Sequence, residues 1–273
     1  MCILTEACKA GDLDLVKQLV GAGMDAKTRG DRLMSASIEG GNLAIVKYLV
    51  ELGVGMLDSF SALALVAVNG HLEILVYLVE LGISASDGGN AVFIAALNGH
   101  LAIVKYLMEL GFKSDYTLLC AAKGGHLEIV KYLIGLGATP VAVRTTLSIA
   151  AETGHLGMLE YTLGIMNSQP ATDDSLKRSA RKGHLEAVKF LLTIGVTEDA
   201  VKDALQAAIV GGCVEVVDYF HKILEMPGGE ECMICAFNCG KMVETECCGQ
   251  KMCEFCLLKL DKCPYCRVST ETD

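Results

Sequence analysis

One nine-residue motif recurs along most of the chain and constrains its fold more than any other feature. The clearest copy reads GHLEIVKYL at residues 125–133. Eight copies begin at equivalent glycines, which are Gly11, Gly41, Gly70, Gly99, Gly125, Gly154, Gly183 and Gly212. The intervals between them are 30, 29, 29, 26, 29, 29 and 29 residues. A period of this length indicates that one supersecondary unit is repeated and stacked.

Each unit holds two segments with helical patterning, separated by the turn glycine. The first is rich in small residues, as in TLLCAAKG, and the second is amphipathic. In the copy at 125–133, Leu127, Val130 and Leu133 share one face, whereas Glu128 and Lys131 point to water. A second glycine follows where a helix C-terminus favours a left-handed residue, at Gly53, Gly82, Gly111, Gly137 and Gly195. One helix pair cannot bury both of its faces, so we predict an all-α solenoid of about eight short repeats over residues 1–226.

These units resemble the ankyrin repeat, in which a small-residue helix, Gly-His and an apolar helix follow one another. They are shorter than the usual unit of about 33 residues. They also lack the Thr-Pro-Leu-His opening, so we expect short turns in place of β-hairpin fingers. Abbreviated repeats of this kind are similar to those in ankyrin proteins of large DNA viruses.

The resemblance to ankyrin repeats implies a concave face that holds a protein partner or substrate. In that family the two residues before Gly-His project onto this face. Val68 and Leu97 are apolar at such positions in neighbouring repeats, where solvent exposure is expected. We therefore predict Val68, Asn69, Leu97 and Asn98 as partner-binding residues.

Two other residue types recur with the repeat. Five histidines occupy the Gly-His position, but copies one repeat apart cannot meet around a single ion. We interpret each as a residue that caps or braces its own inter-helix turn. The tyrosines of the second segments are interpreted as packing residues.

Charge and hydropathy narrow the classes of partner. The chain carries 33 acidic and 23 basic residues, a net charge of -10, which disfavours nucleic acid as a partner. No segment reaches the roughly 18 apolar residues that a bilayer span needs, so we expect no membrane association. The clustered cysteines described next favour a reducing compartment. We expect the cytoplasm, the host's if the chain is viral, and the nucleus is left open as an alternative.

The cysteines divide the chain into two domains. Nine of the 13 lie in the last 46 residues, beyond a predicted linker at 227–229. The segment 230–270 has too few apolar side chains for an independent core, so a bound metal would have to hold it together. Three Cys-x-x-Cys pairs have the spacing of zinc knuckles, namely Cys232/Cys235, Cys253/Cys256 and Cys263/Cys266. With Cys247 and Cys248 they give eight thiolates, enough for two zinc ions, and leave Cys239 over. Disulfides and a thiol-redox site are the weaker alternatives, because the cysteine number is odd and no βαβ pattern surrounds a pair.

The order of these ligands resembles the RING finger, a zinc module that acts in ubiquitin transfer. The resemblance implies that Cys232, Cys235, Cys253 and Cys256 hold one ion. Cys263 and Cys266 hold the other, together with two ligands from the middle of the segment. Most RING fingers read Cys-Gly-His there, whereas this chain has Cys248-Gly249-Gln250. We therefore assign Cys247 and Cys248, with Cys239 as the alternative to Cys247.

The RING resemblance also implies roles for residues beside the ligands. Ile234, Leu260 and Pro264 would contact a ubiquitin-conjugating enzyme, and Arg267 would orient its ubiquitin. In the alternative interpretation Ile234 and Leu260 only cover the zinc knuckles and Arg267 is a solvated charge. The predicted function is a RING-type ubiquitin ligase, without a covalent ubiquitin intermediate, whose ankyrin repeats recruit a protein substrate. The alternative is a non-enzymatic adaptor, because Leu260 stands where an aromatic is common and the usual histidine is missing.

Overall fold

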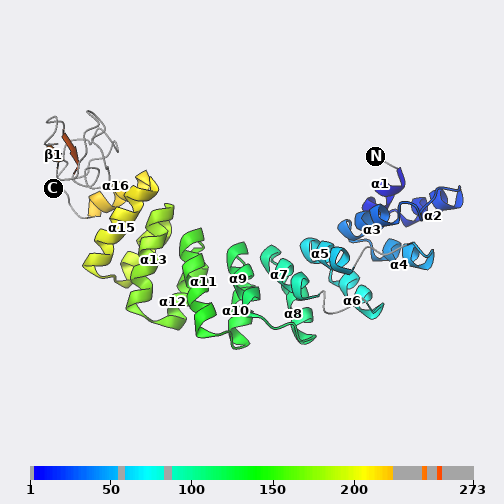
Figure 1. The fold of residues 1–273 in the computed structure, drawn as a ribbon, viewed down its shortest axis with the longest axis horizontal. Helices are drawn as coiled ribbons and strands as arrows, with labels where there is room; N and C mark the ends of the chain where they lie inside the picture. The colour runs from blue at the N-terminus through cyan, green and yellow to red at the C-terminus, as the bar shows by residue number, and fades with distance from the viewer. Residues whose placement is uncertain (1–2, 55–58, 83–87, 224–241, 245–250, 254–273) are drawn as a thin grey trace, which may run out of the picture. The chain divides into compact units, whose positions relative to one another are not determined.

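A computed structural model describes residues 3–54, 59–82, 88–223, 242–244 and 251–253 of the 273. The chain divides into two compact units, residues 1–171 and 172–273, and each is described by itself. Each repeat contributes a first and a second helix (Figure 1). The first helices of unit 1 are α1 (Ile3–Ala10), α3 (Gly30–Glu39), α5 (Ser59–Asn69), α7 (Gly88–Asn98), α9 (Asp115–Gly124) and α11 (Pro140–Thr153). The second helices are α2 (Leu13–Gly21), α4 (Leu43–Glu51), α6 (Leu72–Glu80), α8 (Leu101–Glu109), α10 (Leu127–Gly135) and α12 (Leu156–Met166).

Unit 2 continues the same pattern and ends in a small hairpin. Its helices are α13 (Gln169–Lys182), which starts at the unit boundary, α14 (Leu185–Ile194), α15 (Glu198–Gly211) and α16 (Val214–Ile223). The strands β1 (Met242–Glu244) and β2 (Lys251–Cys253) pair antiparallel, with Met242 opposite Cys253. The predicted all-helical solenoid is therefore confirmed for the helices from Ile3 to Ile223, whereas the linker at 227–229 lies outside the described residues.

The two rows of unit 1 pack with different closeness. Neighbouring first helices contact one another extensively, while neighbouring second helices touch at few points. Small side chains permit this close approach, since Ala95, Ala121 and Ala150 of successive first helices are all fully buried. The first helices therefore form the more tightly spaced, concave side of unit 1.

The buried face of each second helix is the predicted one. In α10, Val130 and Leu133 are buried, whereas Glu128 and Lys131 are exposed and form an ion pair of 2.8 Å. Leu127 is only half-buried. The core thus lies between the two helix rows and runs from repeat to repeat within each unit.

The turn glycines serve both backbone conformation and close packing. Gly70 has φ +83°, and a Cβ placed there would lie 2.4 Å from Nδ1 of His100 in the next repeat. The predicted second glycines also have positive φ, as at Gly53 (67°) and Gly137 (92°). A side chain at Gly70 would therefore strain the backbone and also push the next repeat away.

Most of the connections between repeats that the structure describes are short turns, as predicted, whereas residues 22–29 between α2 and α3 form a longer loop. Only residues 195–197 join α14 to α15. Thr197 caps α15 by accepting a hydrogen bond from the Ala200 amide, and its own hydroxyl donates to Asp173 Oδ2 at 2.9 Å. None of the described connections between helices contains a strand. No described helix is both long enough and apolar enough to cross a bilayer.

Candidate functional site

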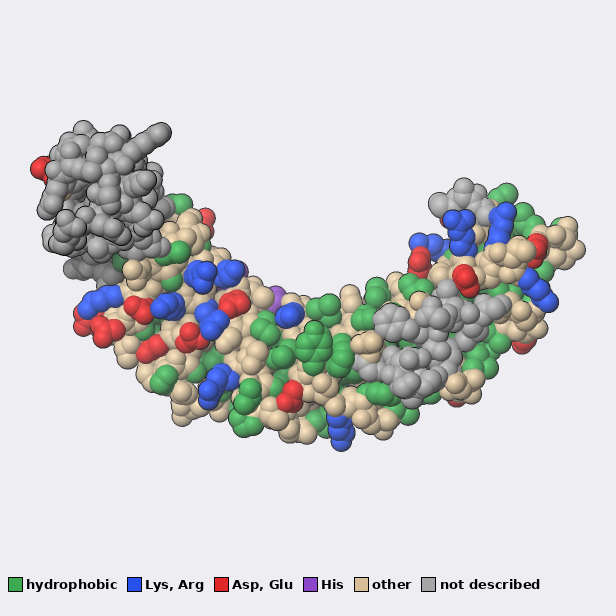
Figure 2. Space-filling model, viewed as in Figure 1, with side chains coloured by type: hydrophobic (Ala, Val, Ile, Leu, Met, Phe, Trp, Pro, Cys, Tyr) green, Lys and Arg blue, Asp and Glu red, His purple; other side chains and the backbone are tan. Residues whose placement is uncertain are grey.

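An apolar patch lies on the first helices of unit 1. It comprises Val68 of α5, Phe93 and Leu97 of α7, and Tyr116 of α9. Val68, Leu97 and Tyr116 are 47%, 45% and 52% exposed. The Phe93 and Tyr116 rings make an edge-to-face contact with centroids 4.9 Å apart. Figure 2 shows hydrophobic side chains gathered over α7 and α9 in the middle of this face.

The surroundings of the patch are unusually free of charge. Neither α5 (SFSALALVAVN) nor α7 (GGNAVFIAALN) contains an acidic or basic residue. A solvent-facing helix of a soluble protein usually carries charges on its outer side. The adjacent helices α5 and α7 therefore leave this face without the charges that are usual there.

Sequence analysis found part of this patch and missed its aromatic residues. Val68 and Leu97 are exposed, as predicted. Asn69 and Asn98 each donate a side-chain hydrogen bond of 2.8 Å to the carbonyl four residues earlier in their own helix, so one function of these amides is internal. Phe93 and Tyr116 were missed because their contact joins different repeats. An aromatic residue within a small-residue helix was the available signal.

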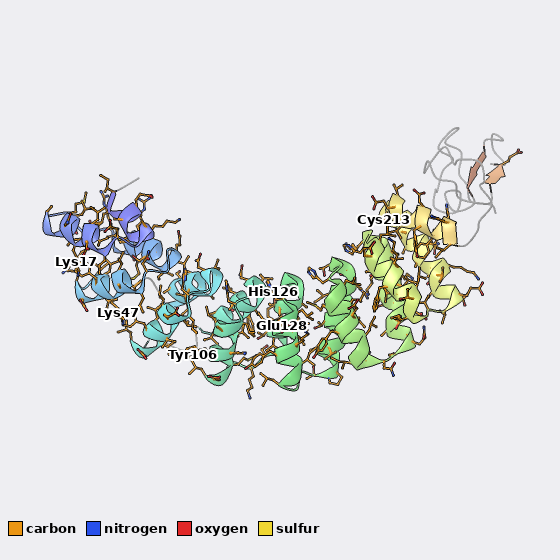
Figure 3. All side chains as sticks on the ribbon, turned by 180° about the vertical axis from the view of Figure 1, so that it is seen from behind. Lys17, Lys47, Tyr106, His126, Glu128 and Cys213 are labelled. Carbon is orange, nitrogen blue, oxygen red and sulfur yellow. The ribbon has the colours of Figure 1, made fainter. Side chains whose placement is uncertain are left out.

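The patch is fixed in place by histidines of the following repeats. His100 Nε2 donates to the carbonyl of Val68 at 2.8 Å, and His126 Nε2 donates to that of Leu97 at 2.9 Å. His71 Nε2 makes the equivalent contact with the backbone carbonyl of Glu39 at 3.3 Å. Figure 3 shows His126 at the turn between α9 and α10. The prediction that each histidine caps or braces its own turn is wrong for these residues, because the imidazole reaches back to the preceding repeat and makes no side-chain cap.

Asn42 and Cys213 replace the histidine in two repeats, and each also donates to a carbonyl of the preceding repeat. Asn42 Nδ2 donates to the carbonyls of Cys8 and Lys9 at 2.8 and 3.0 Å. In unit 2, Cys213 Sγ donates to the Arg181 carbonyl at 3.3 Å. Asp12 belongs to the first repeat, and the described part of the chain contains no repeat before it; its carboxylate caps its own helix by accepting from the Leu15 amide at 2.9 Å.

The recurring tyrosines form a second series across repeats. A lysine of one second helix lies over the tyrosine ring of the next, with Nζ to centroid distances of 5.7, 5.2, 5.4, 6.0 and 5.8 Å. The pairs are Lys17–Tyr48, Lys47–Tyr77, Lys105–Tyr132, Lys131–Tyr161 and, in unit 2, Lys189–Tyr219. Figure 3 labels Lys17, Lys47 and Tyr106 on the second helices. The tyrosines are half-buried, so their interpretation as packing residues is confirmed and extended.

Most of the predicted zinc and conjugating-enzyme residues lie outside the described residues. This holds for Cys232, Cys235, Cys247, Cys248, Cys256, Cys263, Cys266, Ile234, Leu260, Pro264 and Arg267. Only the backbone of Cys253 is described, as the last residue of β2. In the part of the chain that the structure describes, no three His, Cys, Asp or Glu side chains gather to hold a metal.

Comparison with known families assigns the repeats. A family model described as ankyrin repeats (3 copies) matches residues 4–87, 33–117, 84–144 and 118–202. A search of curated proteins found no significant match.

Proposed function

Because this chain belongs to the ankyrin repeat family, we propose that its repeats bind a protein through the apolar patch on α5, α7 and α9. Val68, Leu97 and Tyr116 are each about half exposed. Val68 and Leu97 lie on α5 and α7, which contain no charged residue, and Tyr116 lies on the neighbouring helix α9. Covering a large apolar side chain stabilises a complex by about 1.5–3 kcal/mol when its burial is complete. Tyr116 can act as the anchor, since tyrosine is enriched among the residues that dominate binding energy.

Binding at the patch can be tested with a control at the equivalent repeat position. Leu97→Glu places a charge in the patch, whereas Val210→Glu changes a 50% exposed valine two residues before Gly212 in unit 2. In cells, proximity labelling by the Val210→Glu variant should mark the same proteins as the unchanged chain does. The Leu97→Glu variant should no longer mark those proteins. Equal labelling by both variants would contradict the use of this patch.

We further propose that the C-terminal segment is a zinc-bound RING-type module, which makes the whole chain a ubiquitin ligase. The donor set supports it, since thiolates are the ligands that structural zinc prefers. The hairpin also supports it. Residues 245–250 join β1 to β2, and β2 runs away from that connection to end at Cys253. Cys247 and Cys248 thus precede the strand in the sequence, and Cys253 is its last residue.

In this proposal zinc holds the segment together and takes no part in the reaction. Cys232, Cys235, Cys253 and Cys256 hold one ion; Cys247, Cys248, Cys263 and Cys266 hold the other. Ile234, Leu260 and Pro264 bind the conjugating enzyme. Arg267 orients its ubiquitin through charge-assisted hydrogen bonds.

The proposed reaction is aminolysis of a thioester. The amine of a substrate lysine attacks the thioester carbonyl of ubiquitin, the thiolate of the conjugating enzyme leaves, and an isopeptide bond forms. The ligase contributes by holding these groups in a reactive arrangement. No cysteine of this chain becomes acylated.

Discharge of a ubiquitin-loaded conjugating enzyme to free lysine tests this function. Ile234→Ala should weaken binding of the conjugating enzyme, by more than about 2 kcal/mol if Ile234 is a buried anchor. Arg267→Ala should leave that binding nearly intact and slow the discharge. If the zinc-loaded protein fails to accelerate discharge from every conjugating enzyme tested, the non-enzymatic adaptor is favoured. The unusual Leu260 and Gln250 are also compatible with that alternative.

A further inference from the structure

An acidic and apolar edge runs along the second helices of unit 1, on elements other than those of the apolar patch. The helices α4, α6 and α8 each end in a glutamate that is followed by a leucine and a glycine. Glu51, Glu80 and Glu109 are exposed. Leu81 and Leu110 are 46% and 44% exposed. We call Glu51, Glu80, Leu81, Glu109 and Leu110 the Glu-Leu edge.

The glutamates of the Glu-Leu edge occupy an unfavourable position. The C-terminus of a helix carries partial negative charge, so an acidic side chain in the last turn is repelled. The last turns of α4, α6 and α8 contain no basic residue to offset this repulsion. The same local cost therefore recurs in three consecutive repeats.

Nearby lysines do not neutralise these glutamates. Lys47 and Lys105 precede Glu51 and Glu109 by four residues, yet their ammonium groups lie over Tyr77 and Tyr132 of the next repeats. Among the ion pairs of the described residues, none includes Glu51, Glu80 or Glu109. Unfavourable local electrostatics that no neighbouring charge compensates are typical of binding surfaces.

We propose that the Glu-Leu edge binds a basic amphipathic helix of a protein partner. Lysine or arginine side chains of that helix would pair with the glutamates and approach the helix C-termini, and its apolar side chains would cover Leu81 and Leu110. This site rests on residues that the proposed function does not use. Failure of either proposal therefore leaves the other standing.

The spacing of the repeats favours a helix over a strand. Packed helices lie about 8–10 Å apart, and the second helices, which touch at fewer points than the first, belong at the wider end of this spacing. Seven residues of an α-helix rise about 10.5 Å and return to the same face, so one side chain can meet each repeat. A step of three residues along an extended strand also covers about 10 Å, but the side chain three positions further on points to the opposite face.

Charge also disfavours two other occupants. A second copy of this chain would place the same glutamates against one another, and the chain already has a net charge of -10. An anionic membrane surface would be repelled for the same reason. A basic segment is the occupant that the edge complements.

The test uses the full chain and two synthetic peptides of equal composition. The first has leucine at seven-residue spacing with lysines beside it, over about three heptads, and the second has the same residues in permuted order. Fluorescence anisotropy at low salt should show the first peptide binding at least about tenfold more tightly than the second. Added salt should weaken this binding.

Charge reversal at the edge should separate binding from stability. Glu51→Lys/Glu80→Lys/Glu109→Lys should weaken peptide binding at least about tenfold and raise Tm, because lysine suits a helix C-terminus. The control Glu73→Lys/Glu128→Lys/Glu160→Lys makes the same charge change at exposed positions away from the helix ends of the edge. It should leave binding within about twofold.

Three results would overturn the proposal. One is that the heptad peptide does not bind at low salt, and another is that the control triple variant weakens binding as much as the edge variant. The third is a dimer of the full chain that Leu81→Ser/Leu110→Ser dissociates, which would assign the edge to a second copy. Leu97→Glu should leave peptide binding unchanged.

Discussion

The histidine of the repeat acts between repeats and not within its own turn. His100 and His126 donate to the carbonyls of Val68 and Leu97, so the residues of the apolar patch are held by the repeats that follow them. Sequence alone identified the position but not the partner, because the acceptor carbonyl comes near only after two repeats stack. Asn42 and Cys213 stand in the place of the histidine, and each donates to a carbonyl of the preceding repeat.

We predict that His100→Asn is tolerated and that His100→Ala is not. Asparagine already makes this contact at Asn42. Alanine leaves the Val68 carbonyl without its protein donor and opens a gap beside Gly70; because this hydrogen bond is exposed, we expect a cost of about 0.5–1.5 kcal/mol of the free energy of unfolding. Urea unfolding followed by circular dichroism would measure both variants. Equal stability of the two variants would show that the hydrogen bond contributes nothing.

A second prediction at this scale concerns the pH dependence of stability at His221 of α16. Burial lowers the pKa of His221 from its usual 6.5, and the exposed Asp218 carboxylate opposes this only in part. The unfolded chain therefore binds the proton more readily than the folded chain. The contribution of His221 to stability is present above the unfolded pKa and is lost as the pH falls below it.

His221→Gln should flatten that dependence, since glutamine does not titrate. Urea midpoints at about pH 5.5 and 7.5 would bracket the usual histidine pKa. The difference between the two midpoints should be smaller in the variant than in the unchanged protein. An unchanged difference would show that other groups govern the pH response.

At the scale of the element, the repeat period predicted the helix pairs and their buried faces well. It did not predict that α11, α13 and α15 extend to 14 residues, whereas the first helices of earlier repeats have 8 to 11. The signal was present in Thr139-Pro140 and Thr197, because a threonine cap and a proline in the first turn start a helix. Pairing Thr197 with Asp173, 24 residues earlier, required the fold.

The lysine–tyrosine series has a gap at Val76, and filling it should stabilise unit 1. Val76 occupies the position of Lys47 and Lys105, and Tyr106 occupies that of Tyr77 and Tyr132. Val76→Lys should place an ammonium over Tyr106 and add about 0.5–1 kcal/mol to the free energy of unfolding. The lysine stem can cover the surface that valine leaves.

Two controls isolate the cation–π contact in a urea-unfolding series. Val76→Met keeps a long apolar stem without charge, and Tyr106→Leu removes the ring. The gain from Val76→Lys over Val76→Met should vanish in the Tyr106→Leu background. Persistence of that gain without the ring would mean that lysine acts through Glu80, four residues later.

At the scale of the whole molecule, we expect two kinds of stabilisation. Within each unit the helices bury a core shared between neighbouring repeats, so their stability is roughly a sum over interfaces. The segment 230–270 has few apolar side chains, and its folding would depend on the free energy of zinc binding. Spacing predicts its ligands, but three-residue strands provide little pairing of their own. The sequence therefore predicts which residues would hold zinc, but it does not predict the geometry of the proposed sites.

We predict that a strong chelator will release two zinc ions per chain and make eight additional thiols reactive. Metal-bound thiolates are protected, whereas free tail cysteines would be solvated. Of the described solenoid cysteines, Cys8 and Cys120 are buried, and burial raises the pKa of both Cys120 and Cys213. The raised pKa keeps the Cys120 and Cys213 thiols protonated at neutral pH, so they react slowly.

Thiol titration beside a colorimetric zinc assay would give both numbers, and circular dichroism would follow the helices. The helical signal should persist after chelation, since each repeat of a solenoid is stabilised by its neighbouring repeats. Cys253→Ser should reproduce the loss of the tail fold with the helices intact. Release of one ion and four thiols per chain would indicate a single zinc site. Thiols that become reactive only after a reductant is added would indicate disulfides. Either result would contradict the arrangement of Cys232/Cys235/Cys253/Cys256 and Cys247/Cys248/Cys263/Cys266 around two ions.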